Sequence, residues 1–321
     1  MATLQPLRLP IKLAKRVSRK LFPASYPNSW WDCCGQAAGD LIRNSLLAPE
    51  PCMIARLGIV EMNAIYASWE INSKASLFSK VVRTIRGEIN FYDWDPELLD
   101  SMVNNAGFFP ANEAHLKAFA DRMLLDIPEI DILGAWWPGE CRLYPYLPAA
   151  RRIPLKDLEP YYHPNPWSEV LANQKVLVIH PFEKSIQKQY ANREKLFKDP
   201  RILPDFTLLT LKAVQSIARN ETGFSNWFEA LNWMCTQIRS LDFDIAIIGA
   251  GAYGLPLAAF IKRMGKKAIQ LGGATQILFG IRGQRWDRMP FFQQLYNQNW
   301  IRPLPEETPA NFQKVEGGCY W

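Results

Sequence analysis

The sequence predicts an α/β protein with a Rossmann-like, mostly parallel sheet, helices on both faces of the sheet and a helical N-terminal region. Two observations lead to this prediction. In the second half of the chain, short segments that are apolar throughout alternate with helical stretches of about 10–15 residues. Strands that are apolar at every position are typical of parallel sheets covered by helices on both sides. From residue 23 to about 170 the pattern is mostly helical.

The first half begins with helical patterns and contains two apolar strands. Asp95-Pro96 and Asn112 are typical helix starts. The stretch 144–167 contains six prolines and is expected to be a connector. The expected helices are 34–47, 59–71, 75–87, 96–106 and 112–126, and the expected strands are 51–56 and 130–137.

The second half reads as a regular alternation of strand and helix. The expected strands are 175–180, 206–211, 243–248 and 267–271, and the expected helices are 182–198, 226–240, 252–264 and 274–280. We expect a basic N-terminal segment at 1–22, a single α/β domain at 23–299 and an extended tail at 300–321. The tail ends in Tyr320-Trp321, aromatic residues that can anchor it.

The excess positive charge lies at the N-terminus. The net charge is +6, and residues 1–22 hold six Lys and Arg residues and no acid. The rest of the chain is neutral, so it offers no basic face for nucleic acid, and no nucleic-acid partner is expected. Apolar residues recur at helical spacing between the cations, at Ile11, Ala14, Val17 and Leu21. Two interpretations stay open: attachment to an anionic membrane surface, or an arm packed on its own domain.

Cysteine and histidine usage excludes several kinds of site. The six cysteines form no CxxC motif, and a reduced compartment fits them best. With three histidines in the chain, local spacing assembles no zinc or multi-histidine iron site, so any metal is expected on carboxylates. No apolar run reaches the length of about 18–20 residues that a membrane-spanning helix needs, and we expect a cytoplasmic protein.

A glycine-rich turn follows the strand at 243–248. Gly249, Gly251 and Gly254 form a GxGxxG motif between a strand and a helix, where backbone N–H groups can hold a phosphate. The next strand ends in Gln270-Leu271-Gly272, without the acid that binds a ribose hydroxyl in dinucleotide folds. NAD is therefore not expected. The alternative is a tight turn without a ligand.

Other candidate residues also follow strands, because ligands bind at the carboxyl ends of a parallel sheet. Arg56 and Glu61 are placed to hold a diphosphate and a divalent ion, unless Glu61 only complements its helix dipole. His180 is either a core histidine or a cleft residue, and Trp136-Trp137 either stack on a ligand or pack internally. The remaining candidates are Gly58, Lys184, Gly272, Gly273, Thr275 and Gln276.

Three segments carry a family resemblance: ARLGIVEMNAI at 55–65, VLVIHPFEKSIQKQY at 176–190, and DIAIIGAGAYGLPLAAFIKRMGKKAIQLGGATQILFG at 244–280. Together they resemble the bacterial glycosyltransferases of the GT-D fold and their relatives encoded among polysaccharide-assembly genes. That family carries a glycine followed by an Asp-x-Glu signature, which binds the nucleotide-sugar diphosphate with its metal. Gly58 and Glu61 match the signature, and Ile59 stands at its Asp position. The resemblance implies a Rossmann-like sheet that binds a nucleotide-sugar donor at its strand ends.

We therefore expect a glycosyltransferase that moves a sugar from a nucleotide-sugar donor to a glycan or lipid-linked acceptor. Arg56, His180 and the turn from Gly249 to Gly254 are expected to neutralise the departing diphosphate. Glu61 is expected to hold Mn²⁺ or Mg²⁺ or to orient the donor. Two other functions stay open: a non-catalytic nucleotide-sugar-binding protein and an NAD-dependent oxidoreductase that uses the glycine-rich turn.

Overall fold

A computed structural model describes residues 10, 11, 13–18 and 31–321. Its centre is a seven-stranded sheet in the order β3-β2-β1-β7-β6-β4-β5, and every neighbouring pair is parallel. The strands are β1 (Met53–Ala55), β2 (Ile132–Ala135), β3 (Arg151–Pro154), β4 (Lys175–His180), β5 (Thr207–Lys212), β6 (Ile245–Ile248) and β7 (Lys267–Gln270). The predicted α/β fold with a parallel sheet is confirmed.

Helices surround the sheet, and side chains before the first turn cap several of them. Ser76, Asp95, Asn112 and Asn226 each accept a hydrogen bond from a backbone N–H in the first turn of the helix that follows. The α-helices are α2 (Gln36–Leu47), α3 (Ile59–Asn72), α4 (Leu77–Ile85), α5 (Pro96–Asn104), α6 (Glu113–Asp126), α7 (Glu183–Tyr190), α8 (Trp227–Arg239), α9 (Gly254–Arg263), α10 (Ala274–Leu278), α11 (Gln284–Asp287) and α12 (Pro290–Leu295).

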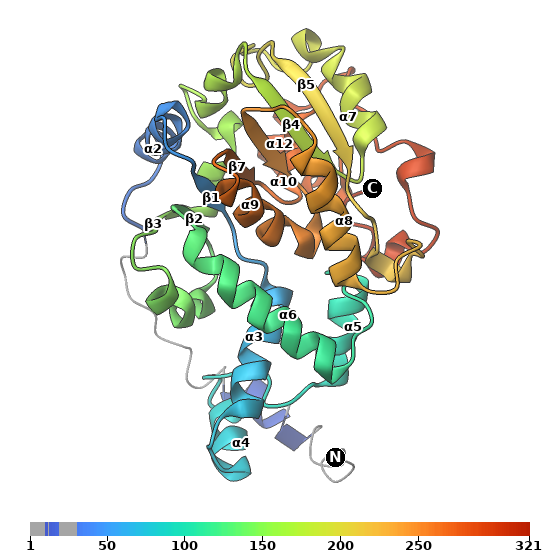
Figure 1. Ribbon diagram of the computed structural model, residues 1–321. Helices are drawn as coiled ribbons and strands as arrows, with labels where there is room; N and C mark the ends of the chain where they lie inside the picture. Colours follow the sequence, from blue (N-terminus) through green and yellow to red (C-terminus); the bar gives the residue numbers. More distant parts are fainter. Residues whose placement is uncertain (1–9, 12, 19–30) are drawn as a thin grey trace.

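The sheet separates two hydrophobic cores. Successive side chains of a strand point to opposite faces, so in β4 Leu177 and Ile179 enter one core while Val176 and Val178 enter the other. The first core is completed by α3, α5, α6, α8 and α9, and the second by α2, α7, α10 and α12. Figure 1 shows α8 and α9 on one side of the strands. Burial on both faces explains why the strands are apolar throughout.

The structure differs from the sequence prediction in a few elements. The strand β3 lies inside the expected connector, because Arg151-Arg152-Ile153-Pro154 pairs with β2 at the edge of the sheet, where proline is tolerated. The helix expected over 182–198 ends at Tyr190 and is followed by a short 3-10 helix, Arg193–Lys195.

The expected extended tail is instead compact. Residues 300–321 contain the 3-10 helices η9 (Pro305–Glu307) and η10 (Phe312–Lys314), followed by a run of turns. As expected, the terminal aromatic residues anchor it: Trp321 is buried, and its ring packs against Phe182 at 5.8 Å between ring centroids. Val315 and Trp321 belong to the second core, so the tail is part of the main domain.

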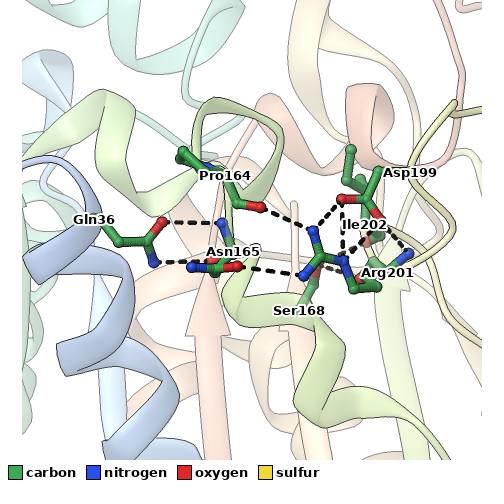
Figure 2. A network of polar contacts seen from close by, with 7 residues as sticks. All are labelled: Gln36, Pro164, Asn165, Ser168, Asp199, Arg201 and Ile202. Carbon is green, nitrogen blue, oxygen red and sulfur yellow. Dashed lines mark hydrogen bonds and ion pairs between the residues drawn. The ribbon is translucent and has the colours of Figure 1, made fainter.

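A polar network fixes the proline-rich connector to the second face of the sheet (Figure 2). Arg201 forms an ion pair with Asp199 and donates to Pro164 O and to Asn165 Oδ1. Gln36 at the start of α2 exchanges two hydrogen bonds with the backbone of Asn165. Ser168 Oγ donates to the carbonyls of Arg201 and Ile202. The connector is thus tied to α2 and to the β4–β5 connection.

The described part of the N-terminal segment packs on the molecule itself. Residues 10, 11 and 13–18 are helical, and Ile11 is buried in a small cluster with Ile89 and Tyr92. Ala14 is partly buried and Val17 exposed, whereas Leu21 lies outside the described residues. In the described ranges, no helix has the length and apolar composition to cross a membrane.

Candidate functional site

A cavity of about 460 Å³ opens at the carboxyl ends of the strands. Its position follows from the connections of the sheet. The helices after β1 and β6 pack on the first core, and those after β4 and β7 pack on the second. The loops therefore separate and leave a crevice, the usual ligand site in such sheets.

Most predicted site residues line this cavity, although they come from four different strand ends. They are Arg56, Gly58, Glu61, His180, Gly249, Gly251, Gly272, Gly273 and Gln276. Three do not line it. Thr275 is fully buried behind Gly249, Gly254 packs against the side chain of Gln270, and Lys184 points to solvent.

Lys184 is engaged by the protein's own tail. Its backbone N–H donates to Glu307 Oε1 at 2.7 Å, and its Nζ lies 3.5 Å from Glu306 Oε1. The buried carboxylate of Glu307 also accepts the N–H of Ser185, and it thereby caps the N-terminus of α7. The N-terminus of α7 is therefore occupied by Glu307 and is not open to a ligand. The expected role of Lys184 in ligand binding has no geometric support.

The glycines of the GxGxxG turn have three different roles. A Cβ on Gly249 would lie 2.5 Å from His180 Cδ2 and 2.7 Å from the carbonyl oxygen of Gly272, so only glycine fits. Gly251 has a φ of 53°, and a Cβ there would make only an ordinary contact at 3.7 Å from Ala106 O, so its requirement is conformational. Gly254 allows α9 to approach Gln270 at the end of β7. Gly249 and Gly251 line the cavity, whereas Gly254 serves packing.

The second glycine turn is partly covered by the tail. A Cβ on Gly273 would lie 2.6 Å from Cε1 of Tyr320, whose ring rests on this residue. Gly272 has a φ of 61°, and a Cβ there would lie 3.4 Å from the Arg56 side chain. Contact with Tyr320 is thus sufficient to explain the glycine at position 273. The pair Gly272-Gly273 does not by itself indicate a phosphate-binding turn.

Arg56 supplies positive charge to the lining of the cavity. It is half-buried, and its guanidinium carbon lies 5.6 Å from the centre of the Trp136 ring. Its backbone N–H donates to Gln270 Oε1 at 3.3 Å. Within the described ranges its guanidinium has no ion-pair partner. A half-buried, unpaired guanidinium on a rigid strand end is suited to bind an anion.

Glu61 lies in the first turn of α3 and folds back over Gly58. A Cβ on Gly58 would lie 2.0 Å from Glu61 Oε2, so glycine at this position makes room for the carboxylate. Burial raises the pKa of Glu61, whereas its own N–H and the charge of Arg56 act in the opposite direction. The structure therefore places an acid with a raised pKa near the Arg56 guanidinium, in the cavity wall next to the apolar side chain of Ile59.

His180 contributes a neutral imidazole. Burial lowers its pKa to about 3. Its Nδ1 accepts the backbone N–H of Phe182 at 3.0 Å, so the proton of the neutral ring lies on Nε2. His180 can therefore donate a hydrogen bond into the cavity, but it carries no positive charge at neutral pH. The expected charge neutralisation by His180 is corrected to hydrogen bonding.

Sequence reasoning missed the contribution of the C-terminal region to the cavity. Arg285, Glu316, Tyr320 and Trp321 all line it. Arg285 forms an ion pair with Glu316, and its guanidinium carbon lies 4.8 Å from the centre of the Tyr320 ring. The terminal residues Tyr320 and Trp321 indicated that the tail is anchored. Their sequence position contains no information on where in the fold their rings lie.

The two tryptophans after β2 have separate roles. Trp136 lines the cavity, and its Nε1 donates to Leu57 O at 3.0 Å. Trp137 packs against Tyr66 in the first core, with ring centroids 6.2 Å apart. Buried Glu140 accepts the backbone N–H groups of both tryptophans and so fixes this strand end. Burial raises the pKa of Glu140 to about 8.

The described side chains do not fit a metal held by the protein alone. Over the described residues, no group of three or more His, Cys, Asp or Glu side chains is placed to bind a metal ion. At the position of a second carboxylate, Ile59 contributes an apolar side chain.

Comparisons of the chain with protein-family models, with curated proteins and with solved structures found no match. Its function is therefore inferred from the residues of the cavity.

Proposed function

We propose that the protein is a glycosyltransferase that binds a nucleotide-sugar donor in the cavity at the strand ends. The observation that carries this proposal is the convergence of Arg56, the His180 Nε2–H and the Gly249–Gly251 turn on one cavity. A cation, a neutral donor and a backbone turn with a positive φ together suit the oxygens of a diphosphate.

In the proposed reaction the bond between the donor sugar and the diphosphate breaks, and the sugar carbon bonds to an acceptor hydroxyl oxygen. The hydroxyl proton is released to solvent or to the departing diphosphate. The negative charge that develops on the departing diphosphate is stabilised by the Arg56 guanidinium and by the His180 N–H. Glu61 holds the donor beside Arg56.

The cavity suits NAD less well. Gln270 stands where a dinucleotide-binding protein has an acid for the ribose hydroxyls, and it is buried. Its side chain accepts the N–H of Arg56 and packs against Gly254. This amide lines the cavity but is already hydrogen-bonded to Arg56, and it lacks the charge with which an acid binds the ribose hydroxyls. This favours a nucleoside diphosphate over a dinucleotide.

A non-catalytic nucleotide-sugar-binding protein is the second candidate. Ile59 and the lack of a carboxylate cluster across the described residues favour it, since a metal that assists departure of the diphosphate would lack a second protein ligand. Measured turnover of a bound donor separates the two candidates.

The first experiment is a thermal-shift screen of uridine, guanosine and cytidine diphosphate sugars against NADH, with and without Mn²⁺. A ligand at 100 times its dissociation constant stabilises the fold by about 2.7 kcal/mol. We expect at least one nucleoside diphosphate sugar to raise the melting temperature, and Arg56→Ala to abolish that rise. Stabilisation by NADH alone would contradict the proposal.

A further inference from the structure

The C-terminal region brings a second guanidinium to the donor cavity. Arg285 and Glu316 both line the cavity, and they form an ion pair with each other. The pair is partly open to solvent, since 34% of the Arg285 side chain and 47% of the Glu316 side chain are exposed. A partly exposed ion pair contributes little to stability, so the two side chains can separate without disturbing the fold.

Part of the Arg285 guanidinium remains free to bind a ligand. Its Nη2 donates to a carboxylate oxygen of Glu316 and, at 3.2 Å, to the sulfur of Cys319. Among the described residues, no acceptor is hydrogen-bonded to its Nε or Nη1. The guanidinium carbon lies 4.8 Å from the centre of the Tyr320 ring and 5.8 Å from that of the Trp286 ring. A guanidinium held by two aromatic rings, with free N–H groups, is suited to a two-point contact with a phosphate.

A chain of contacts connects Arg285 with Arg56. The ring of Tyr320 contacts Arg285 and covers Gly273. The neighbouring Gly272 lies beside the Arg56 side chain, which a Cβ there would approach to 3.4 Å. Burial raises the pKa of the Tyr320 hydroxyl, and the charges of both guanidiniums oppose this rise. The two guanidiniums are therefore close to the same ring, and a diphosphate has two phosphate groups with which to contact them.

Glu316 has a backbone conformation that favours glycine. Its φ is 46°, and the next two residues, Gly317 and Gly318, have φ values of 71° and 83°. A side chain other than glycine is strained in this region, and such residues cluster at functional sites. The turn lies between buried Val315 and buried Cys319. The chain is thus anchored on both sides of a strained glutamate whose side chain lines the cavity.

The formal charges of the described residues that line the cavity cancel. Arg56 and Arg285 are the cations, and Glu61 and Glu316 are the carboxylates, whereas His180 is neutral. The charge of Glu316 also acts on Glu61: burial raises the pKa of Glu61, Arg56 opposes the rise and Glu316 adds to it. Movement of the Glu316 carboxylate away from Arg285 would therefore leave the lining with an excess of positive charge, which favours an anion.

We propose that Arg285 is a second cationic contact for the donor diphosphate, and that Glu316 competes with the diphosphate for this guanidinium. Glu316 holds Arg285 in the free protein, and the donor replaces one anionic partner with another. A ligand must carry enough negative charge to displace a carboxylate, which selects a diphosphate over an uncharged ligand. Because the ligand is taken to be the nucleotide-sugar donor, this assignment rests on the proposed function.

The test is calorimetric titration of the full-length protein with inorganic pyrophosphate, a diphosphate without nucleoside or sugar. We expect Arg285→Gln to weaken pyrophosphate binding roughly tenfold or more, because a charged hydrogen bond is lost. Arg285→Lys keeps the charge and should recover part of the loss. Glu316→Gln should tighten binding roughly threefold or more, because the competing charge is removed. In the Arg285→Gln background, Glu316→Gln should have no further effect.

Two variants serve as matched controls. Glu306 is a similarly exposed glutamate of the same tail, paired with Lys184, and Arg302 is paired with Asp287. None of these four residues lines the cavity. Glu306→Gln and Arg302→Gln change the net charge as Glu316→Gln and Arg285→Gln do, and both should bind pyrophosphate like the wild type. Melting curves show which variants are folded, and Glu316→Gln decides the matter if Arg285→Gln is not.

The proposal is overturned if Glu316→Gln leaves pyrophosphate affinity unchanged or weakens it, because the ion pair then only holds the tail in place. It is also overturned if neither the wild type nor Glu316→Gln binds pyrophosphate. Nucleotide-sugar binding that needs Arg56 but is unaffected in Arg285→Gln would leave the proposed function intact and exclude the role of Arg285. Pyrophosphate binding that follows both residues, without stabilisation by any nucleotide sugar, would support the anion site and contradict the proposed function.

Discussion

At the scale of single residues, the cavity depends on glycines that leave room for functional side chains. Gly58 is the clearest example, because the Glu61 carboxylate occupies the volume of the missing Cβ. The nearest atoms are the end of a flexible side chain, so the carboxylate can move away without distorting the backbone. An alanine at position 58 is therefore expected to displace the Glu61 carboxylate while leaving the backbone fold unchanged.

We predict that Gly58→Ala displaces Glu61 and thereby removes its proposed hydrogen bond to the donor. Nucleotide-sugar binding should weaken roughly tenfold or more. The free energy of unfolding should change by less than about 1 kcal/mol. Calorimetric titration and denaturant unfolding measure the two quantities. Glu61→Gln is the companion variant and should lose turnover. An active Glu61→Gln protein with slightly reduced stability would mean that Glu61 only complements the helix dipole.

The buried imidazole of His180 predicts a specific dependence of stability on pH. Its pKa is about 3 in the folded chain and 6.5 when unperturbed. As pH falls through 6.5 the unfolded chain takes up a proton that the folded chain does not, so stability is lost between about pH 6.5 and about pH 3. Buried acids with a raised pKa, such as Glu140, act in the opposite direction, so the wild type alone does not isolate the effect.

A comparison with His180→Gln isolates the contribution of His180 to this pH dependence. The glutamine side chain does not titrate, and its amide oxygen can accept the Phe182 N–H. We predict that the advantage of the wild type in unfolding free energy falls by about 2 kcal/mol from pH 7 to pH 5. Urea unfolding of both proteins at the two pH values measures this. A constant difference between them would mean that His180 is accessible to protons in the folded chain.

At the scale of elements, the tail determines how α7 begins. Glu307 from η9 accepts the N–H groups of Lys184 and Ser185 and the hydroxyl of Ser185. These donors would otherwise lack a helical partner, and they lie just beyond His180 at the end of β4. The tail thus stabilises the start of the helix that follows the His180 strand end.

We predict that Glu307→Ala lowers the free energy of unfolding by about 1.5–3 kcal/mol, the usual cost of losing hydrogen bonds to a charged group. Glu307→Gln should recover part of this, because its amide oxygen can still accept. The neighbouring Glu306 is exposed, so Glu306→Ala is the matched control and should be nearly neutral. Equal losses in the two alanine variants would contradict the capping role.

At the scale of the whole molecule, the two ends of the chain differ in how they are attached. The tail places Trp300, Val315 and Trp321 in the second core. The described N-terminal segment buries Ile11 in a cluster of three buried residues. The domain expected at 23–299 therefore lacks part of its own core.

We predict that a chain ending at residue 299 fails to fold cooperatively, because the loss of buried Trp300, Val315 and Trp321 and of the Glu307 cap is comparable with the usual stability margin of about 5–15 kcal/mol. A chain starting at residue 23 should fold and bind the donor, with only a small decrease in melting temperature. Circular dichroism with thermal unfolding tests both. If the chain ending at 299 melts cooperatively, the tail is an addition to an independent domain.

The sequence by itself determined the local structure and identified nine binding-site residues that line the cavity. Apolar strands such as 175–180 and capped helices such as the one after Asn112 were predictable, because burial on both faces and the first turn of a helix each impose a local pattern. Arg56, Glu61 and His180 were found because they follow strands, and parallel strands end at one edge.

Only the tertiary structure decided how these residues are used. Tyr320 covers Gly273 and Glu307 caps α7, although more than 40 residues separate the members of each pair. The sequence pattern of a segment carries no record of such distant partners, so it could not show that Lys184 is engaged or that Gly273 serves packing. The neutral state of His180 has the same origin, because burial by the whole fold sets its pKa.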